Sequence, residues 1–156
     1  MKYPLNIPYI SKLEKKYVND VLKSQWLSIN GKHTQIFEKK FSKFLNTKYA
    51  LAVQSGTAAV HTALRALNIK ENDKVIIPNF TCVANISCLS QIKAKPVIVD
   101  VENDTQGIDF ESFKIAVKKH KPKAVQLVHV YGHPARDTIL ISNFRKKNKI
   151  FLIEDA

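Results

Sequence analysis

Short apolar runs alternate with helical segments from residue 48 to the end of the chain, and this alternation constrains the fold more than any other feature. The runs that favour strands are residues 49–53, 74–77, 96–101, 124–130 and 150–153. The spacing of apolar residues predicts helices over 58–67, 81–92, 110–119 and 137–147. Strands that are apolar along their length and separated by helices are typical of a parallel sheet covered on both faces. We therefore expect an α/β fold in three layers, with a mostly parallel sheet and helices on both of its faces.

The first 47 residues favour helices without strands. Ser11 and Glu14 form a capping box that predicts a helix to about Lys23, and a second helix is expected from about Thr34 to Asn46. The side chains expected to face inward are Leu13, Tyr17, Val18, Val21, Leu22, Phe37, Phe41, Phe44 and Leu45. The 156 residues are one domain's length, so we divide them into a helical segment, 1–47, and an alternating segment, 48–156.

Composition excludes several classes of protein. Apolar residues make up 45% of the chain and charged residues 24%, as in ordinary globular domains. No apolar run approaches the roughly 20 residues that span a membrane, and the N-terminus lacks the apolar core of a signal peptide, so we expect a cytoplasmic protein. No metal site is expected, because Cys82 and Cys88 match no ligand spacing and a turn separates His129 from His133.

The net charge of +12 raises the question of a nucleic-acid partner. The 25 basic residues include only three arginines, and arginine is the residue that reads base edges and grips phosphates in bidentate fashion. The lysines are spread along the whole chain, mostly at polar positions of the predicted helices. We therefore interpret the charge as solvated surface, with an anionic substrate such as a sugar nucleotide as the alternative, and we expect no nucleic-acid partner.

Two features could carry chemistry at the carboxyl ends of the strands, where ligands bind in such folds. Residues 55–58 (SGTA) join a strand to a helix, a junction that offers free backbone N–H groups to a phosphate; the alternative is a turn capped by Ser55 or Thr57. Asp155 follows an apolar strand, where a carboxylate needs a partner such as a protonated pyridine nitrogen; the alternative is a cap for the next element. His129, at another strand end, either lines the site or is a packed structural histidine. Residues 55–57, 79–82, 129–133 and Asp155 are expected to converge at this edge.

Some common sites are absent from the sequence. It contains neither a dinucleotide-binding G-x-G-x-x-G loop nor a P-loop, and no nucleophile elbow. The chain ends directly after a predicted strand, from which we expect an incomplete domain.

Three motifs occur in order, SGTAA at 55–59, HVYGHPA at 129–135 and EDA at 154–156, joined by shorter ones such as WLS at 26–28 and DKVIIP at 73–78. With this set, essentially the whole chain resembles the DegT/StrS family of pyridoxal-phosphate-dependent sugar-nucleotide aminotransferases. The resemblance implies the incomplete large domain of the aspartate-aminotransferase fold (fold type I). It also implies a homodimer for the complete protein.

The resemblance assigns roles to matching residues. Gly56, Thr57 and Ala58 would hold the phosphate of pyridoxal 5′-phosphate, and Asp155 would pair with the pyridine nitrogen. Cys82 stands where the family often has an aromatic residue stacked on the pyridine ring. The family's Schiff-base lysine lies beyond Ala156, so this chain contains no expected catalytic residue and is expected to be inactive alone. His129 is kept as a candidate for substrate binding.

The resemblance also implies the reaction. Members transfer an amino group from glutamate to a keto sugar on a nucleotide, with pyridoxamine phosphate as the other form of the cofactor. The stretch 15–32 looks most like the perosamine synthases, which favours GDP-4-keto-6-deoxymannose. Two alternatives remain: a pyridoxamine-phosphate-dependent sugar dehydratase of the same family, in which histidine replaces the lysine, and a non-catalytic truncated product that binds polyanions or partners.

Overall fold

A computed structural model describes residues 7–156, which separate into two compact units with the boundary between Ala52 and Val53. Each unit is described by itself. Among the described residues, no helix has both the length and the apolar character that crossing a membrane requires.

The first unit contains α1 (Lys12–Ser24) and α2 (Lys32–Phe44). The capping box is confirmed, because Ser11 Oγ accepts from the Leu13 N–H and the Glu14 carboxylate accepts from the Ser11 N–H at 2.8 Å. The predicted burial is wrong: neither helix has a buried residue, and Phe44 is 83% exposed. The physical reason is size, since two helices of this length cannot enclose a core between them.

Residues 49–53 do not form the predicted strand. They carry no ladder partner anywhere in residues 7–156, and their backbone is irregular. Apolar sequence does not make a strand by itself, because a strand exists only through hydrogen bonds to a neighbouring strand.

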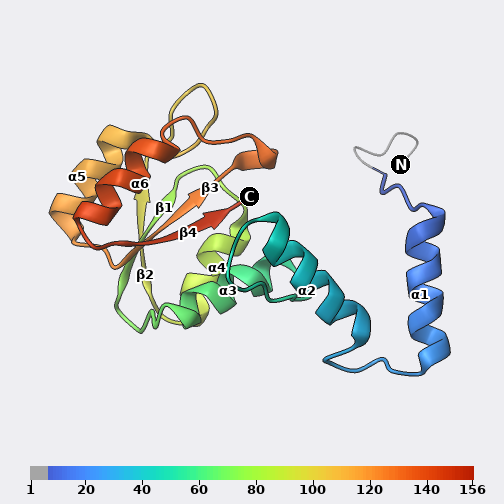
Figure 1. Cartoon of the computed structure of the whole chain (residues 1–156). Helices are drawn as coiled ribbons and strands as arrows, with labels where there is room; N and C mark the ends of the chain where they lie inside the picture. Colours follow the sequence, from blue (N-terminus) through green and yellow to red (C-terminus); the bar gives the residue numbers. More distant parts are fainter. Residues whose placement is uncertain (1–6) are drawn as a thin grey trace. The chain divides into compact units, whose positions relative to one another are not determined.

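The second unit confirms the three-layer α/β prediction. Its parallel sheet has the order β2-β1-β3-β4, with strands β1 (Lys74–Pro78), β2 (Lys95–Val99), β3 (Ala124–Val128) and β4 (Phe151–Asp155). Figure 1 shows α5 (Phe110–His120) and α6 (Thr138–Lys147) over one face of the sheet, and α3 (Gly56–Ala66) and α4 (Val83–Gln91) over the other. We call these the α5/α6 face and the α3/α4 face. A short 3-10 helix, Val130–Gly132, follows β3.

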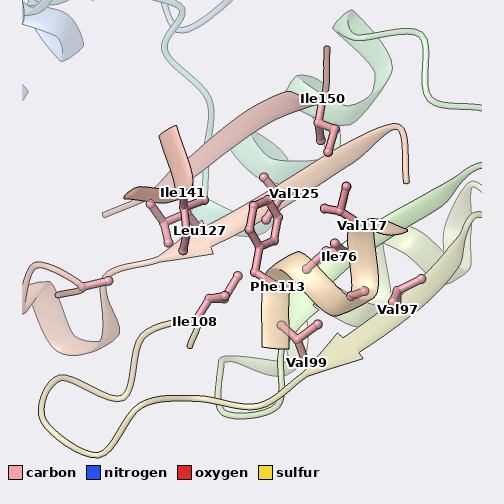
Figure 2. Close-up of a cluster of buried hydrophobic side chains, with 12 residues drawn as sticks. Ile76, Val97, Val99, Ile108, Phe113, Val117, Val125, Leu127, Ile141 and Ile150 are labelled. Atoms are coloured by element: carbon pink, nitrogen blue, oxygen red, sulfur yellow. The ribbon is translucent and has the colours of Figure 1, made fainter. Parts of the chain in front are cut away.

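Side chains of β1, β3 and β4 alternate between two clusters, whereas β2, at the edge of the sheet, contributes to one of them and leaves Ile98 exposed. On the α5/α6 face, Phe113 lies among aliphatic side chains from three strands and from α6 (Figure 2). On the α3/α4 face, Ile77 and Ile153 join Leu64 of α3 and Leu89 of α4. A sheet buried on both faces fits strands that are apolar along their length.

The helices α5 and α4 begin differently. Asp109 caps α5, and its carboxylate accepts from the Ser112 N–H at 2.8 Å. At α4 the N-cap is Cys82, and the preceding Thr81 Oγ1 accepts from the Asn85 side chain at 2.9 Å. Thr81 is therefore fixed by α4 without being its cap.

The loop after β2 is held from inside by Glu102, whose side chain is 2% exposed. Its carboxylate accepts from the Thr105 hydroxyl and from the backbone N–H groups of Asp104, Thr105 and Gly107. Burial alone would raise the pKa of Glu102, but these hydrogen bonds outweigh it and lower the pKa to about 2. Arg136 joins the loop to α6, since its guanidinium lies 2.7 Å from the Asp104 carboxylate.

Replacing Gly107 with alanine should destabilise this loop. A Cβ added at Gly107 would lie 2.3 Å from the Cβ of Ala135 and 3.1 Å from its Cα, and the backbone there cannot yield cheaply. We expect urea denaturation to show a loss of about 1–3 kcal/mol, the usual cost of overpacking. Gly56→Ala is the control, because nothing lies within 4 Å of a Cβ added there. Equal losses in both variants would contradict the steric explanation.

Candidate functional site

A cavity of about 470 Å³ lies at the carboxyl ends of the strands. Residues 80–82, 128–132 and 155–156 line it, so three of the four segments expected to converge do meet. A larger cavity of about 640 Å³ lies in the first unit, around the turn between α1 and α2, and brings together none of the predicted site residues.

The fourth segment, residues 55–57, does not line the cavity, but it contacts Cys88 of α4, the helix that begins beside Cys82 at the cavity wall. The Cys88 thiol donates to the Thr57 carbonyl at 3.3 Å. Burial raises the pKa of this thiol, and the negative charge of Asp155 raises it further. The start of α3 therefore contacts Cys88, and residues of α3 and β4 belong to the same buried cluster as Cys88. The sequence analysis did not propose Cys88 as a site residue. The one feature that could have indicated it is its position among the apolar residues of α4 that face the sheet.

The N-terminus of α3 presents free donors. Ser55 is the N-cap, and its Oγ accepts from the Ala58 N–H at 3.2 Å. The N–H groups of Gly56 and Thr57 have no acceptor within residues 7–156. Two of the three predicted phosphate-binding residues thus offer free backbone donors at the positive end of a helix, whereas the Ala58 donor is used by the cap.

Asp155 ends β4 on the α3/α4 face. Ile153, two residues earlier, belongs to the core of that face, and alternate residues of a strand share a face. The Asp155 carboxylate is half-buried and has no hydrogen-bond or ion-pair partner among residues 7–156. A partly desolvated carboxylate without a partner at a cavity wall is suited to binding a cationic group.

Cys82 lines the same cavity from the start of α4. The thiol is exposed, and it makes no hydrogen bond to the end of the helix that it precedes. It is therefore free to contact a bound molecule.

His129 also lines the cavity, but both nitrogens of its ring have partners. Nδ1 accepts from the Ala135 N–H at 2.9 Å, and Nε2 lies 2.8 Å from Glu154 Oε1. The side chain is only 10% exposed. A histidine bound in this way has no ring nitrogen left for a substrate, so the structure favours another role for it.

The opposite edge of the sheet, where the strands begin, is basic. Backbone bonds from Asn72 to Lys93 (2.9 Å) and from Lys123 to Lys74 (2.8 Å) hold its loops side by side. We call this the basic edge, formed by Lys70, Lys74, Lys93, Lys95, Lys118, Lys119, Lys121, Lys123, Lys146, Lys147 and Lys149. The sequence suggested scattered lysines, but parallel strands bring their first residues to one edge. Some of these lysines also lie in the last turns of helices, where they complement the helix dipole.

The model of the DegT/DnrJ/EryC1/StrS aminotransferase family matches residues 8–156. The chain is 39% identical over 157 residues to GDP-perosamine synthase of Escherichia coli O157:H7, a match that covers 100% of this chain and 43% of that protein.

Two solved structures are also similar. The aminotransferase from Psychrobacter cryohalolentis has a TM-score of 0.86 at 35% identity, covering 94% of this chain and 37% of that one. The E. coli GDP-4-keto-6-deoxy-D-mannose-3-dehydratase with bound hydrated PLP has a TM-score of 0.88 at 30% identity, covering 99% and 40%. The chain thus spans about two fifths of the length of the relatives it matches.

Proposed function

The chain belongs to the DegT/DnrJ/EryC1/StrS aminotransferase family, and we propose that it is the N-terminal portion of an enzyme that transfers an amino group from glutamate to a nucleotide-linked keto-deoxy sugar. The cofactor is pyridoxal 5′-phosphate, which supplies an electron sink when bound. We favour GDP-4-keto-6-deoxymannose as the sugar substrate, supported by the 39% identity to a GDP-perosamine synthase. A cytoplasmic homodimer is proposed for the complete protein.

The residues at the start of α3 and those lining the cavity fit the two ends of this cofactor. The free N–H groups of Gly56 and Thr57 would bind the phosphate, and the absence of a Cβ at Gly56 leaves the approach open. The Asp155 carboxylate would keep the ring nitrogen protonated, and Cys82 would contact the ring face. The observation that carries the proposal is a helix N-terminus with two free N–H groups and an unpartnered carboxylate at the end of β4, on two elements that share one buried cluster.

The proposal is tested on the product of the complete reading frame. We expect it to convert glutamate to 2-oxoglutarate only when a nucleotide-linked keto sugar is present, and to give an amino sugar detectable by mass spectrometry. GDP-, UDP- and dTDP-linked keto sugars are compared. An amino sugar formed from none of them would contradict the proposal.

A sugar dehydratase of the same family is the second candidate, because the similar dehydratase structure covers nearly all of this chain. The same assay separates the two. Loss of a sugar hydroxyl without a retained amino group would assign the dehydratase. Sequencing the frame past codon 156 gives an independent answer, since lysine or histidine at the Schiff-base position distinguishes the aminotransferase from the dehydratase.

The basic edge also makes polyanion binding a candidate. If polyanion binding is the function in place of amino transfer, fluorescence anisotropy with labelled duplex DNA as the probe should show strongly salt-dependent binding to this chain. Replacing Lys118, Lys119 and Lys121 with glutamine should reduce the slope of log affinity against log salt by about 2–3 if each lysine meets a phosphate. The control replaces Lys12, Lys15 and Lys16 on α1. If both triple variants lose the same slope, attraction is due to net charge and the basic edge is no docking surface.

A further inference from the structure

We propose that His129 is a positioning residue that fixes Asp155, acting from behind the candidate site and not by contact with substrate. His129 holds the end of β4 at two points. Its backbone N–H donates to the Asp155 carbonyl at 2.8 Å, and its ring Nε2 lies 2.8 Å from Glu154 Oε1. Both contacts join the residue after β3 to the last residues of β4.

Glu154 and Asp155, the last two residues of β4, point to opposite faces of the sheet. Leu127 and Glu154 are paired in register, and Leu127 belongs to the core of the α5/α6 face. Asp155 is on the other face, beside α3 and α4. The ring of His129 therefore contacts β4 through Glu154 on the α5/α6 face, while the Asp155 carboxylate remains without a partner on the α3/α4 face.

The contact with Ala135 determines the tautomer of the ring. Nδ1 accepts from the Ala135 N–H, so it must carry a lone pair, and the ring proton is on Nε2, from which it donates to Glu154. The donor is itself fixed, because Ala135 is 4% exposed and the next N–H, that of Arg136, donates to Thr105 Oγ1 at 3.0 Å. Protonating Nδ1 would place two donors face to face and would break this arrangement.

The consequence for function is the direction of the Asp155 carboxylate. A carboxylate that pairs with a pyridinium nitrogen needs a fixed position. At metal sites, residues that orient a ligand typically change the affinity about 10- to 100-fold, and we expect an effect of the same order for the residue that orients Asp155. This inference rests on the proposed cofactor site. Its first test does not depend on the cofactor.

The first test is the tautomer of His129 in the chain alone. Long-range ¹⁵N–¹H spectra of imidazole-labelled protein should show the ring proton of His129 on Nε2, and His129→Gln should identify the signals. A ring whose proton is on Nδ1 would overturn the inference.

The second test measures binding of pyridoxamine 5′-phosphate labelled with ¹⁵N in the ring. This form has no aldehyde, so it cannot react with the 22 lysines of the chain. His129→Asn keeps an acceptor for Ala135 but loses the donor to Glu154, and Glu154→Gln keeps the shape of an exposed side chain while removing its charge. His133→Asn is the control, because this histidine is exposed and lies outside the cavity.

We expect His129→Asn to weaken binding about 10-fold, with Glu154→Gln weakening it in the same direction. We also expect the ring ¹⁵N signal to shift toward the unprotonated value in both variants, which a general loss of stability would not produce. Wild-type binding with unchanged affinity and ¹⁵N shift in both variants would overturn the positioning role and leave the proposed function intact. No binding by the wild-type chain would overturn the cofactor site, and the inference with it.

Discussion

Replacing Glu102 with glutamine is expected to lower the free energy of unfolding by about 3 kcal/mol at neutral pH. The pKa of Glu102 is lowered from 4.5 to about 2 in the folded chain. Each unit of pKa difference between the folded and unfolded states corresponds to about 1.4 kcal/mol. Little discount for solvent screening applies, because the side chain is 2% exposed.

The sign follows from the direction of the shift. Between about pH 4.5 and pH 2 the unfolded chain binds a proton at Glu102 that the folded chain does not bind. The contribution of Glu102 is therefore fully present above pH 4.5 and is lost as the pH falls toward 2. The difference between wild type and Glu102→Gln should shrink over the same interval.

Urea denaturation of both chains from pH 7 to pH 2.5 measures this difference. Glu111→Gln is the control, because Glu111 is 70% exposed and pairs only with Lys114, one turn along α5. It should change stability by less than about 1 kcal/mol at any pH. A gap between wild type and Glu102→Gln that stays constant down to pH 2.5 would show that the carboxylate is not the stabilising group.

The hydrogen bonds of the loop around Glu102 could not be predicted from the sequence. The alternation of apolar runs and helices predicted the layers, because parallel strands and their covering helices each leave a periodic signal. A buried carboxylate leaves no such signal, and its loop also depends on Arg136 N–H bonding to Thr105, 31 residues away. Such contacts follow from the register of the sheet, which one sequence does not encode as a pattern.

For the candidate site, too, the sequence indicated which segments to expect but not the contacts between their side chains. Gly56, Thr57 and Asp155 were expected at the carboxyl edge because each follows an apolar run. This reasoning places Asp155 at the end of β4, whereas residues 49–53 form no strand and the sheet does not place Gly56 and Thr57. What could not be foreseen is the detail around them: that Ser55 takes the Ala58 donor, and that the Cys88 thiol donates to the Thr57 carbonyl. These are side-chain contacts across layers, which periodicity does not resolve.

The largest effect on the site is expected from Asp155→Asn. We expect the dissociation constant of pyridoxamine 5′-phosphate to rise about 10- to 100-fold, because a hydrogen bond between charged groups contributes about 1.5–3 kcal/mol and each 1.4 kcal/mol is a factor of ten. The ring ¹⁵N signal should report a nitrogen that is no longer protonated. Asp100→Asn is the matched control, since Asp100 follows β2 directly and is exposed, but does not line the cavity. Equal weakening in both variants would assign the effect to the charge of the edge.

Inorganic phosphate separates the two ends of the site in the same chains. It can contact the N–H groups at the start of α3 but has no ring nitrogen for Asp155 to hold. Its affinity should therefore be the same in wild type and in Asp155→Asn, or slightly higher in the variant because one negative charge is gone. If Asp155→Asn weakened phosphate and pyridoxamine phosphate alike, the carboxylate would be supporting the fold of this edge and not binding the ring. Unchanged phosphate binding together with the loss of pyridoxamine phosphate binding would assign the phosphate to the start of α3 and the ring nitrogen to Asp155.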